Sequence, residues 1–190
     1  SVQNLKFLLR MEMVIAALTA LLLNLLWIPL IDPITQGKYG VVNIHTIFIL
    51  SLCIPLLYLN NFLWSIHFAM GKLKSIFFIF AITFSINILG DIILIPLFKN
   101  EGAAIAFIIA VFIQSILNLR ITDFSWLKNC WQPLLLCSFS ALISGISSRY
   151  FFWSDWMVIS FAVITYFLFL AATLQLKWSD LKEMKVFFKQ

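Results

Sequence analysis

The chain has little charge for its length. Aspartate, glutamate, lysine and arginine make up 11% of its 190 residues, whereas soluble domains carry about 25%. Hydrophobic residues make up 63% of the chain, and the mean hydropathy is +1.03. A soluble fold of this size would leave large apolar patches in water. The composition therefore excludes an ordinary soluble domain and predicts an integral membrane protein.

Residues and motifs that carry chemistry are also scarce. The three cysteines lack metal-ligand spacing, and we expect Cys53 and Cys137 to be small buried hydrophobes. His45 and His67 lie near opposite ends of one predicted helix, about 33 Å apart at 1.5 Å per residue, so they cannot share a metal. HExxH, nucleophile-elbow, Walker A and GxGxxG motifs are missing. We therefore expect no catalytic residues, no metal site and no bound cofactor.

What the chain does contain is a series of long apolar runs. A hydrocarbon core about 30 Å thick is crossed by roughly 20 apolar helical residues. The runs of about this length are residues 13–31, 44–70, 76–98, 102–119, 131–148 and 153–176. They predict an all-α bundle of six transmembrane helices over residues 13–176. Residues 1–12 are expected to form a cytoplasmic interfacial segment, and residues 177–190 a basic amphipathic tail on the inner leaflet.

The positions of lysine and arginine predict the orientation, because positively charged loops are retained in the cytoplasm. Ten of these residues fall at one end of the predicted bundle: Lys6, Arg10, Lys72, Lys74, Arg120, Lys128, Lys177, Lys182, Lys185 and Lys189. Three fall at the other: Lys38, Lys99 and Arg149. Both termini are then cytoplasmic. This distribution explains the net charge of +5 without a nucleic-acid partner, and we expect membrane lipid to be the main partner.

Polar residues interrupt the third apolar run. Thr83, Asn87 and Asp91 are spaced by four and share one face of a helix. A carboxylate in the hydrocarbon core costs about 2.5 to 3.5 kcal/mol, so Asp91 is expected to face protein or water. Asn87 and Asp91 are therefore candidates for binding H⁺ or Na⁺. Two alternatives stay open: polar contacts between helices, and a shorter helix that brings Asp91 near the outer interface.

The fourth run carries small and amide side chains at a spacing of four. Gly102, Ala106 and Ala110 form a small-residue stripe that favours close packing of helix backbones. Gln114 and Asn118 follow on the same face and need polar partners. Gln114 joins Asn87 and Asp91 as a candidate cavity residue.

The segment from Gly71 to Ala110, GKLKSIFFIFAITFSINILGDIILIPLFKNEGAAIAFIIA, resembles a known family. It is similar to the polysaccharide and lipid-linked oligosaccharide flippases of the multidrug/oligosaccharidyl-lipid/polysaccharide exporter superfamily. The matching features are Gly71-Lys72-x-Lys74, Asn87, Leu94-Ile95-Pro96, the Gly102-Ala103-Ala104-x-Ala106 entry and the upstream turn PITQGKY. Three positions depart from the family pattern: Asp91 replaces a second Asn, Lys99 a turn glycine, and Phe107 a Thr.

The resemblance implies a MATE-like architecture of two six-helix halves around a central cavity, with this chain as the C-terminal half. Because the sequence begins at Ser1 and not at Met, we expect a fragment whose N-terminal six-helix half is missing. The implied function is export of an undecaprenyl-diphosphate-linked sugar, such as an O-antigen or polysaccharide precursor, across the bacterial inner membrane. The implied site is a cavity with Asn87, Asp91 and Gln114, and Arg120 as a possible phosphate contact.

Other functions stay open from the sequence. A drug/cation antiporter of the same superfamily is the nearest alternative. A membrane-embedded polysaccharide polymerase or acyltransferase is another, although such enzymes are expected to carry a sizeable outer loop with Arg or His. A scaffold subunit is the third. Among these we favour a carrier over an enzyme.

Overall fold

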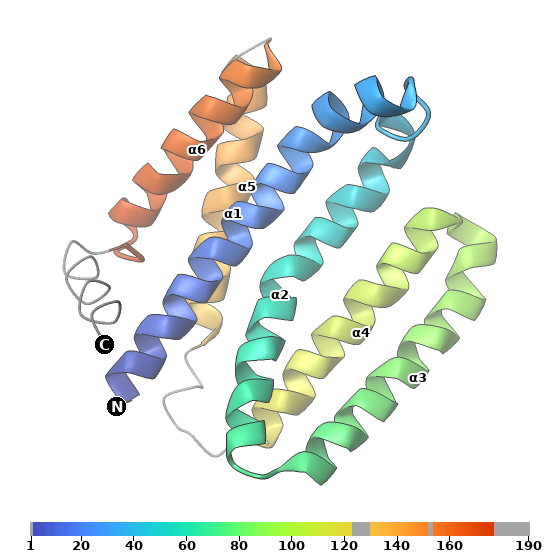
Figure 1. Ribbon diagram of the computed structural model, residues 1–190, viewed down its shortest axis with the longest axis vertical. Coiled ribbons are helices and arrows are strands. Elements are labelled where there is room, and N and C mark those ends of the chain that lie inside the picture. The colour runs from blue at the N-terminus through green and yellow to red at the C-terminus, as the bar shows by residue number, and fades with distance from the viewer. Residues whose placement is uncertain (1, 123–129, 152–153, 177–190) are drawn as a thin grey trace.

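The computed structural model describes residues 2–122, 130–151 and 154–176. Six α-helices and one short 3-10 helix make up these residues (Figure 1). The elements are α1 (Val2–Thr35), η1 (Val41–Asn43), α2 (Ile44–Ala69), α3 (Leu73–Phe98), α4 (Asn100–Arg120), α5 (Trp131–Phe151) and α6 (Asp155–Ala172). All six α-helices are long and apolar enough to cross a membrane. The expected fold class, an all-α membrane bundle of six helices, is confirmed.

The first helix is longer than the sequence indicated. Residues 2–12, expected as a separate interfacial segment, are continuous with α1, and Phe7 and Leu9 are buried in the bundle. At its other end α1 passes Pro29 and Pro33 before it ends at Thr35. The segment 177–190, expected as an amphipathic tail, lies outside the described residues.

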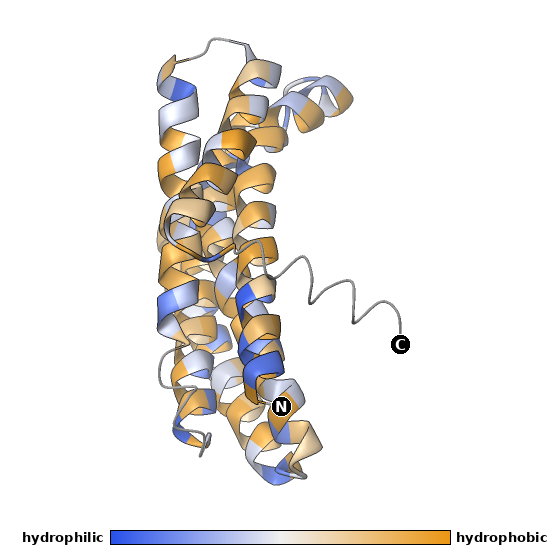
Figure 2. Cartoon of the chain, turned by 90° about the vertical axis from the view of Figure 1, so that its left-hand side faces the viewer, coloured by the Kyte–Doolittle hydropathy of each residue, from blue (hydrophilic) through white to orange (hydrophobic). Residues whose placement is uncertain are grey.

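Helices α1 and α2 lie side by side in the middle of the molecule (Figure 1). Helices α5 and α6 pack on one side of them, and the α3–α4 hairpin packs on the other, mainly through α4 against α2. The main buried core is formed by α1, α2, α5 and α6, with Met13, Leu59, Cys137 and Tyr166 among its members. Apolar residues occur along the helices over the height of the bundle (Figure 2), and many large apolar side chains are exposed. That distribution fits lipid around the molecule.

The two ends of the bundle differ in basic residues. The start of α1, the α2–α3 turn and the end of α4 lie at the lower end in Figure 1, whereas the α1–α2 and α3–α4 turns lie at the upper end. The described lysines and arginines of the larger predicted group therefore lie at the lower end of the bundle, and those of the smaller group lie at the upper end. We refer to the upper end, which the charge distribution predicts to be extracytoplasmic, as the outer end.

Small residues bring α3 and α4 into close contact. A Cβ added at Gly90 would lie 2.8 Å from the Ala106 Cβ, and one added at Gly102 would fall on the Leu94 backbone carbonyl. Gly102, Ala106 and Ala110 are all buried. The Gly102 and Ala106 positions of the stripe therefore face α3 without room for larger side chains.

We expect Gly102→Ala to destabilise the chain by about 1 to 3 kcal/mol, because the new methyl group must displace helix backbone. The measurement is unfolding in detergent followed by tryptophan fluorescence. Gly145→Ala is the matched control, since its added Cβ would meet only the flexible end of Leu21, at 3.1 Å. Equal losses in the two variants would contradict this account of the α3–α4 contact.

The turn between α3 and α4 holds Lys99 in a backbone conformation that favours glycine, with φ 53° and ψ −127°. This is the position where the resembled family has a glycine. We expect Lys99→Gly to raise the free energy of unfolding by about 1 kcal/mol by removing this strain. Lys38→Gly, in the other outer turn, should bring no gain because Lys38 has no positive φ.

Candidate functional site: a cleft between α1, α2 and α5

A partly open cavity of about 250 Å³ lies between α1, α2 and α5 in the outer half of the bundle. Its walls are mostly apolar, with Leu21, Leu52 and Ile146 among the lining residues. Its polar lining residues include Asn24, Ser51 and Arg149. The cavity therefore offers an apolar surface with a few polar groups, which is the usual composition of a site for a small or amphiphilic molecule.

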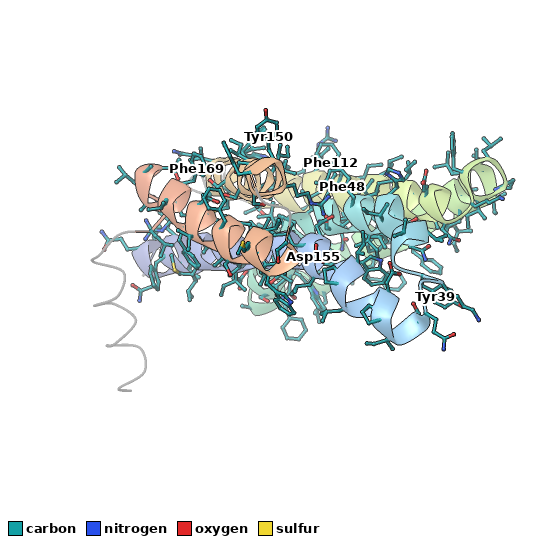
Figure 3. The ribbon with its side chains drawn as sticks, turned by 90° about the horizontal axis from the view of Figure 1, so that it is seen from above. Tyr39, Phe48, Phe112, Tyr150, Asp155 and Phe169 are labelled. Atoms are coloured by element: carbon teal, nitrogen blue, oxygen red, sulfur yellow. The ribbon has the colours of Figure 1, made fainter. Side chains whose placement is uncertain are left out.

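A second cavity of about 220 Å³ continues from the first. The two share Asn24, Leu25 and Arg149, and the second adds Asp155 and Val158 from α6. Figure 3 looks along the bundle and shows Asp155 at the start of α6 beside α1. We call the two cavities together the outer cleft. It has a polar compartment around Arg149 and Asp155 and an apolar compartment around Leu21 and Leu52.

Hydrogen bonds connect α1, α2 and α5 at the outer cleft. The Arg149 guanidinium donates to the Asn24 backbone carbonyl over 3.2 Å. The Asn24 side-chain amide donates to the Ser51 hydroxyl, which donates to the Phe48 carbonyl over 2.7 Å. A guanidinium has five N–H donors, so this one contact leaves Arg149 able to bind an anion. Arg149 is also exposed, which keeps it accessible from the cleft.

Sequence reasoning missed this site, although two signals were present. Arg149 is one of three basic residues on the side that the positive-inside rule disfavours, and Asn24 interrupts an apolar run. Neither signal predicts that the two residues meet, because they lie 125 positions apart in the chain.

The structure brings together two of the predicted site residues. Asn87 and Asp91 both lie on α3, and the Asn87 amide donates to Asp91 Oδ2 over 2.9 Å. Both side chains are half-buried, next to the close contact of Gly90 with Ala106 on α4. The remaining side-chain oxygens, Asn87 Oδ1 and Asp91 Oδ1, are buried without a hydrogen-bond partner.

Asp91 lies within the apolar part of α3. This helix has 26 residues, which corresponds to about 39 Å, and Asp91 is about 10 Å from its outer end. In a hydrocarbon layer about 30 Å thick and centred on α3, the carboxyl group is then roughly 6 Å inside the boundary. The helix is therefore not shortened in the way that would place Asp91 at the interface.

Gln114 and Arg120 do not join this pair. Gln114 is half-buried on α4, and Arg120 is exposed in the last turn of the same helix. Within the described part of the chain, neither side chain is hydrogen-bonded to Asn87 or Asp91. None of the four residues lines the outer cleft. The four predicted site residues therefore do not form a single site.

Buried amides connect α2 to α4 in the inner half of the bundle. Asn60 donates to the Val111 carbonyl over 3.1 Å and accepts from Asn118 over 3.2 Å. Asn60 and Asn118 are both buried. Nearer the inner end, the buried His67 ring is 2.8 Å from the Thr122 hydroxyl. These contacts satisfy polar groups between helices and give them a structural role.

Metal ligands do not cluster in the described residues, where no group of three His, Cys, Asp or Glu side chains is placed to hold a metal ion. Comparisons with protein-family models, with curated proteins and with solved structures find no match for this chain. The fold and the composition define a multi-pass membrane protein with six helices that could each span the bilayer.

We expect Asn60→Leu to lower the free energy of unfolding by about 1 to 3 kcal/mol, because it removes two buried hydrogen bonds and leaves the Asn118 amide without its acceptor. The measurement is again unfolding in detergent. Asn61→Leu is the matched control, since Asn61 is the next residue and its side chain is exposed. A loss of similar size at Asn61 would show that polarity on α2 matters generally and would contradict the specific role of Asn60.

Proposed function

We propose that this chain is one six-helix half of a bacterial inner-membrane flippase that exports a lipid-linked oligosaccharide, such as an O-antigen or polysaccharide precursor. The observation that supports this most is the outer cleft, which combines an arginine, nearby polar groups and an apolar wall in one space. A substrate with a sugar, a diphosphate and a prenyl chain likewise has polar, anionic and apolar parts. The family resemblance in α3 and α4 adds to this argument.

Each part of such a substrate has a counterpart in the cleft. The diphosphate is an anion that Arg149 can bind through charge-assisted hydrogen bonds. Sugar hydroxyls can exchange hydrogen bonds with Asn24, Ser51 and Asp155. The first isoprene units can lie against apolar side chains such as Leu21 and Leu52, and the rest of the chain stays in lipid. Arg120, the earlier candidate for phosphate, lies at the opposite end of the bundle and is the weaker choice.

Transport of this kind needs no covalent chemistry. A carrier binds its substrate in two conformations that open to opposite sides, and the difference in binding free energy between them drives the change. We propose that an N-terminal six-helix half provides the second conformation, while the substrate cleft itself lies within this chain. Coupling to H⁺ or Na⁺ would supply the driving force.

A drug/cation antiporter is the second candidate. The observation that favours it is Asp155, whose carboxylate lines the polar compartment and could bind a lipophilic cation. The two candidates differ in the charge of the ligand and in the side chain that binds it. A polymerase or acyltransferase gains less support, since the buried His67 lies at the inner end, away from the outer cleft.

The test is binding of undecaprenyl-diphosphate sugar to the purified chain, measured by native mass spectrometry. The cleft lies wholly within this chain, so binding does not require a second half. We expect Arg149→Gln to lower the affinity about tenfold, which corresponds to loss of one charged hydrogen bond of about 1.5 kcal/mol. Lys38→Gln, an outer cation that does not line the cleft, should bind as the unmodified chain does.

Competing ligands distinguish the alternatives. Phosphatidylglycerol that competes equally well would show a general anionic-lipid site and contradict the flippase proposal. A lipophilic cation whose binding is lost in Asp155→Asn, with no binding of the lipid-linked sugar, would favour the antiporter.

A further inference from the structure

The Asn87–Asp91 pair has an incomplete hydrogen-bond pattern. The Asn87 amide nitrogen donates to Asp91 Oδ2, while Asn87 Oδ1 and Asp91 Oδ1 are both buried without a partner. An ionised carboxylate can only accept hydrogen bonds, and so can an amide oxygen. The pair therefore holds two acceptors in an apolar setting and lacks one donor.

We infer that Asp91 is a proton-binding site, at which the protonated carboxyl group donates from Oδ1 to Asn87 Oδ1. One proton then satisfies both oxygens. The Asn87 N–H to Asp91 Oδ2 bond stays in place, so the two side chains form a closed amide–acid pair with one hydrogen bond in each direction. The proton adds to the carboxylate oxygen and neutralises its charge, and no other bond forms or breaks.

The opposite orientation of the Asn87 amide gives a poorer pair with a carboxylate. Rotating the amide would place its oxygen against Asp91 Oδ2, where two acceptors repel. The observed orientation already uses the one favourable contact between the side chains. Only an added donor on the oxygens completes it.

A sodium ion fits this place less well than a proton. Hard cations take about six or more oxygen ligands, and the pair offers two unpaired oxygens. The nearby Thr83 hydroxyl already donates to backbone carbonyls of its own helix, over 2.9 Å to Ile79. Across the interface, Ala106 of α4, which has no side-chain oxygen, lies at contact distance from Gly90. It therefore adds no ligand for an ion at the pair.

Few other charged groups belong to the helices packed around the pair. On α3 itself Lys74 lies in the first turn, and Lys99 follows the last residue. On α4 the charged residues are Glu101 and Arg120, one near each end. Helix α2 contributes no charged residue but four titratable groups: His45, Cys53, Tyr58 and His67. In the described residues, none of these side chains is hydrogen-bonded to Asn87 or Asp91.

Infrared difference spectroscopy tests the inference on the full chain in liposomes of phosphatidylethanolamine and phosphatidylglycerol. We expect a carbonyl band of a protonated carboxylic acid that is lost in Asp91→Asn. The asparagine variant is expected to fold, because its amide can both donate to and accept from Asn87. Glu101→Gln, at the outer start of α4, is the matched control and should retain the band.

Isotope labelling gives a reading without mutation. The band should shift when aspartate is labelled with ¹³C and stay in place when only glutamate is labelled. The inference is overturned by a band that is missing at every pH, that survives in Asp91→Asn, or that follows glutamate labelling. Replacing choline with Na⁺ should leave the acid band unchanged, and its loss in Na⁺ would overturn the preference for H⁺.

Proton binding does not depend on the proposed substrate; only its use in transport rests on the proposed function. Asp91 does not line the outer cleft, so Asp91→Asn should keep its affinity for the lipid-linked sugar. Loss of the acid band with unchanged sugar binding supports the two sites as separate. Loss of sugar binding in Asp91→Asn would overturn that separation.

Discussion

A polar group in hydrocarbon has no water to bind, and this constraint decides how the six helices are held together. Asn60 links α2 to the Val111 carbonyl and the Asn118 amide of α4. The buried Tyr166 hydroxyl similarly links α6 to the Val14 carbonyl of α1 over 2.8 Å. Apolar contacts alone discriminate weakly between helix faces, because lipid tails are as apolar as leucine. The paired polar groups therefore fix which faces meet.

The same constraint identifies two places where polar groups are only partly hydrogen-bonded. Arg149 donates one hydrogen bond to the Asn24 carbonyl and keeps donors for an anion at the outer cleft. Asn87 and Asp91 hold two buried oxygens that lack a donor. The first site has unused donors, and the second has unused acceptors. An ion-coupled transporter needs one site for its substrate and another for the coupling ion. The outer cleft and the Asn87–Asp91 pair are proposed for these two roles.

Hydropathy predicted the six helices well because the thickness of the bilayer fixes their length. It placed the start of α1 too late, since residues 2–12 are less apolar yet pack along the bundle with Phe7 and Leu9 buried. Local spacing also predicted the Asn87–Asp91 contact, which is formed within one helix. Asn24 and Arg149 come together only through the packing of α1 on α5. Gln114 lies on α4, and in the described residues its side chain is not hydrogen-bonded to Asn87 or Asp91. Spacing within one helix cannot predict such tertiary relations.

The two proposed sites lie in different parts of the bundle, and α2 is the element that connects them. Ser51 of α2 accepts from Asn24 at the outer cleft, and Asn60 of the same helix is bonded to α4, which contacts α3 at Gly90, the residue before Asp91. Energetic coupling between distant sites requires an element that both sites bias. Pro55 lies in α2 between these two contacts and is buried, and a proline inside a helix removes one backbone hydrogen bond and allows bending. A bend of α2 at this residue would change the outer cleft and the α4 contact together. Helix α2 is therefore the element through which the two proposed activities, proton binding and substrate binding, would be linked.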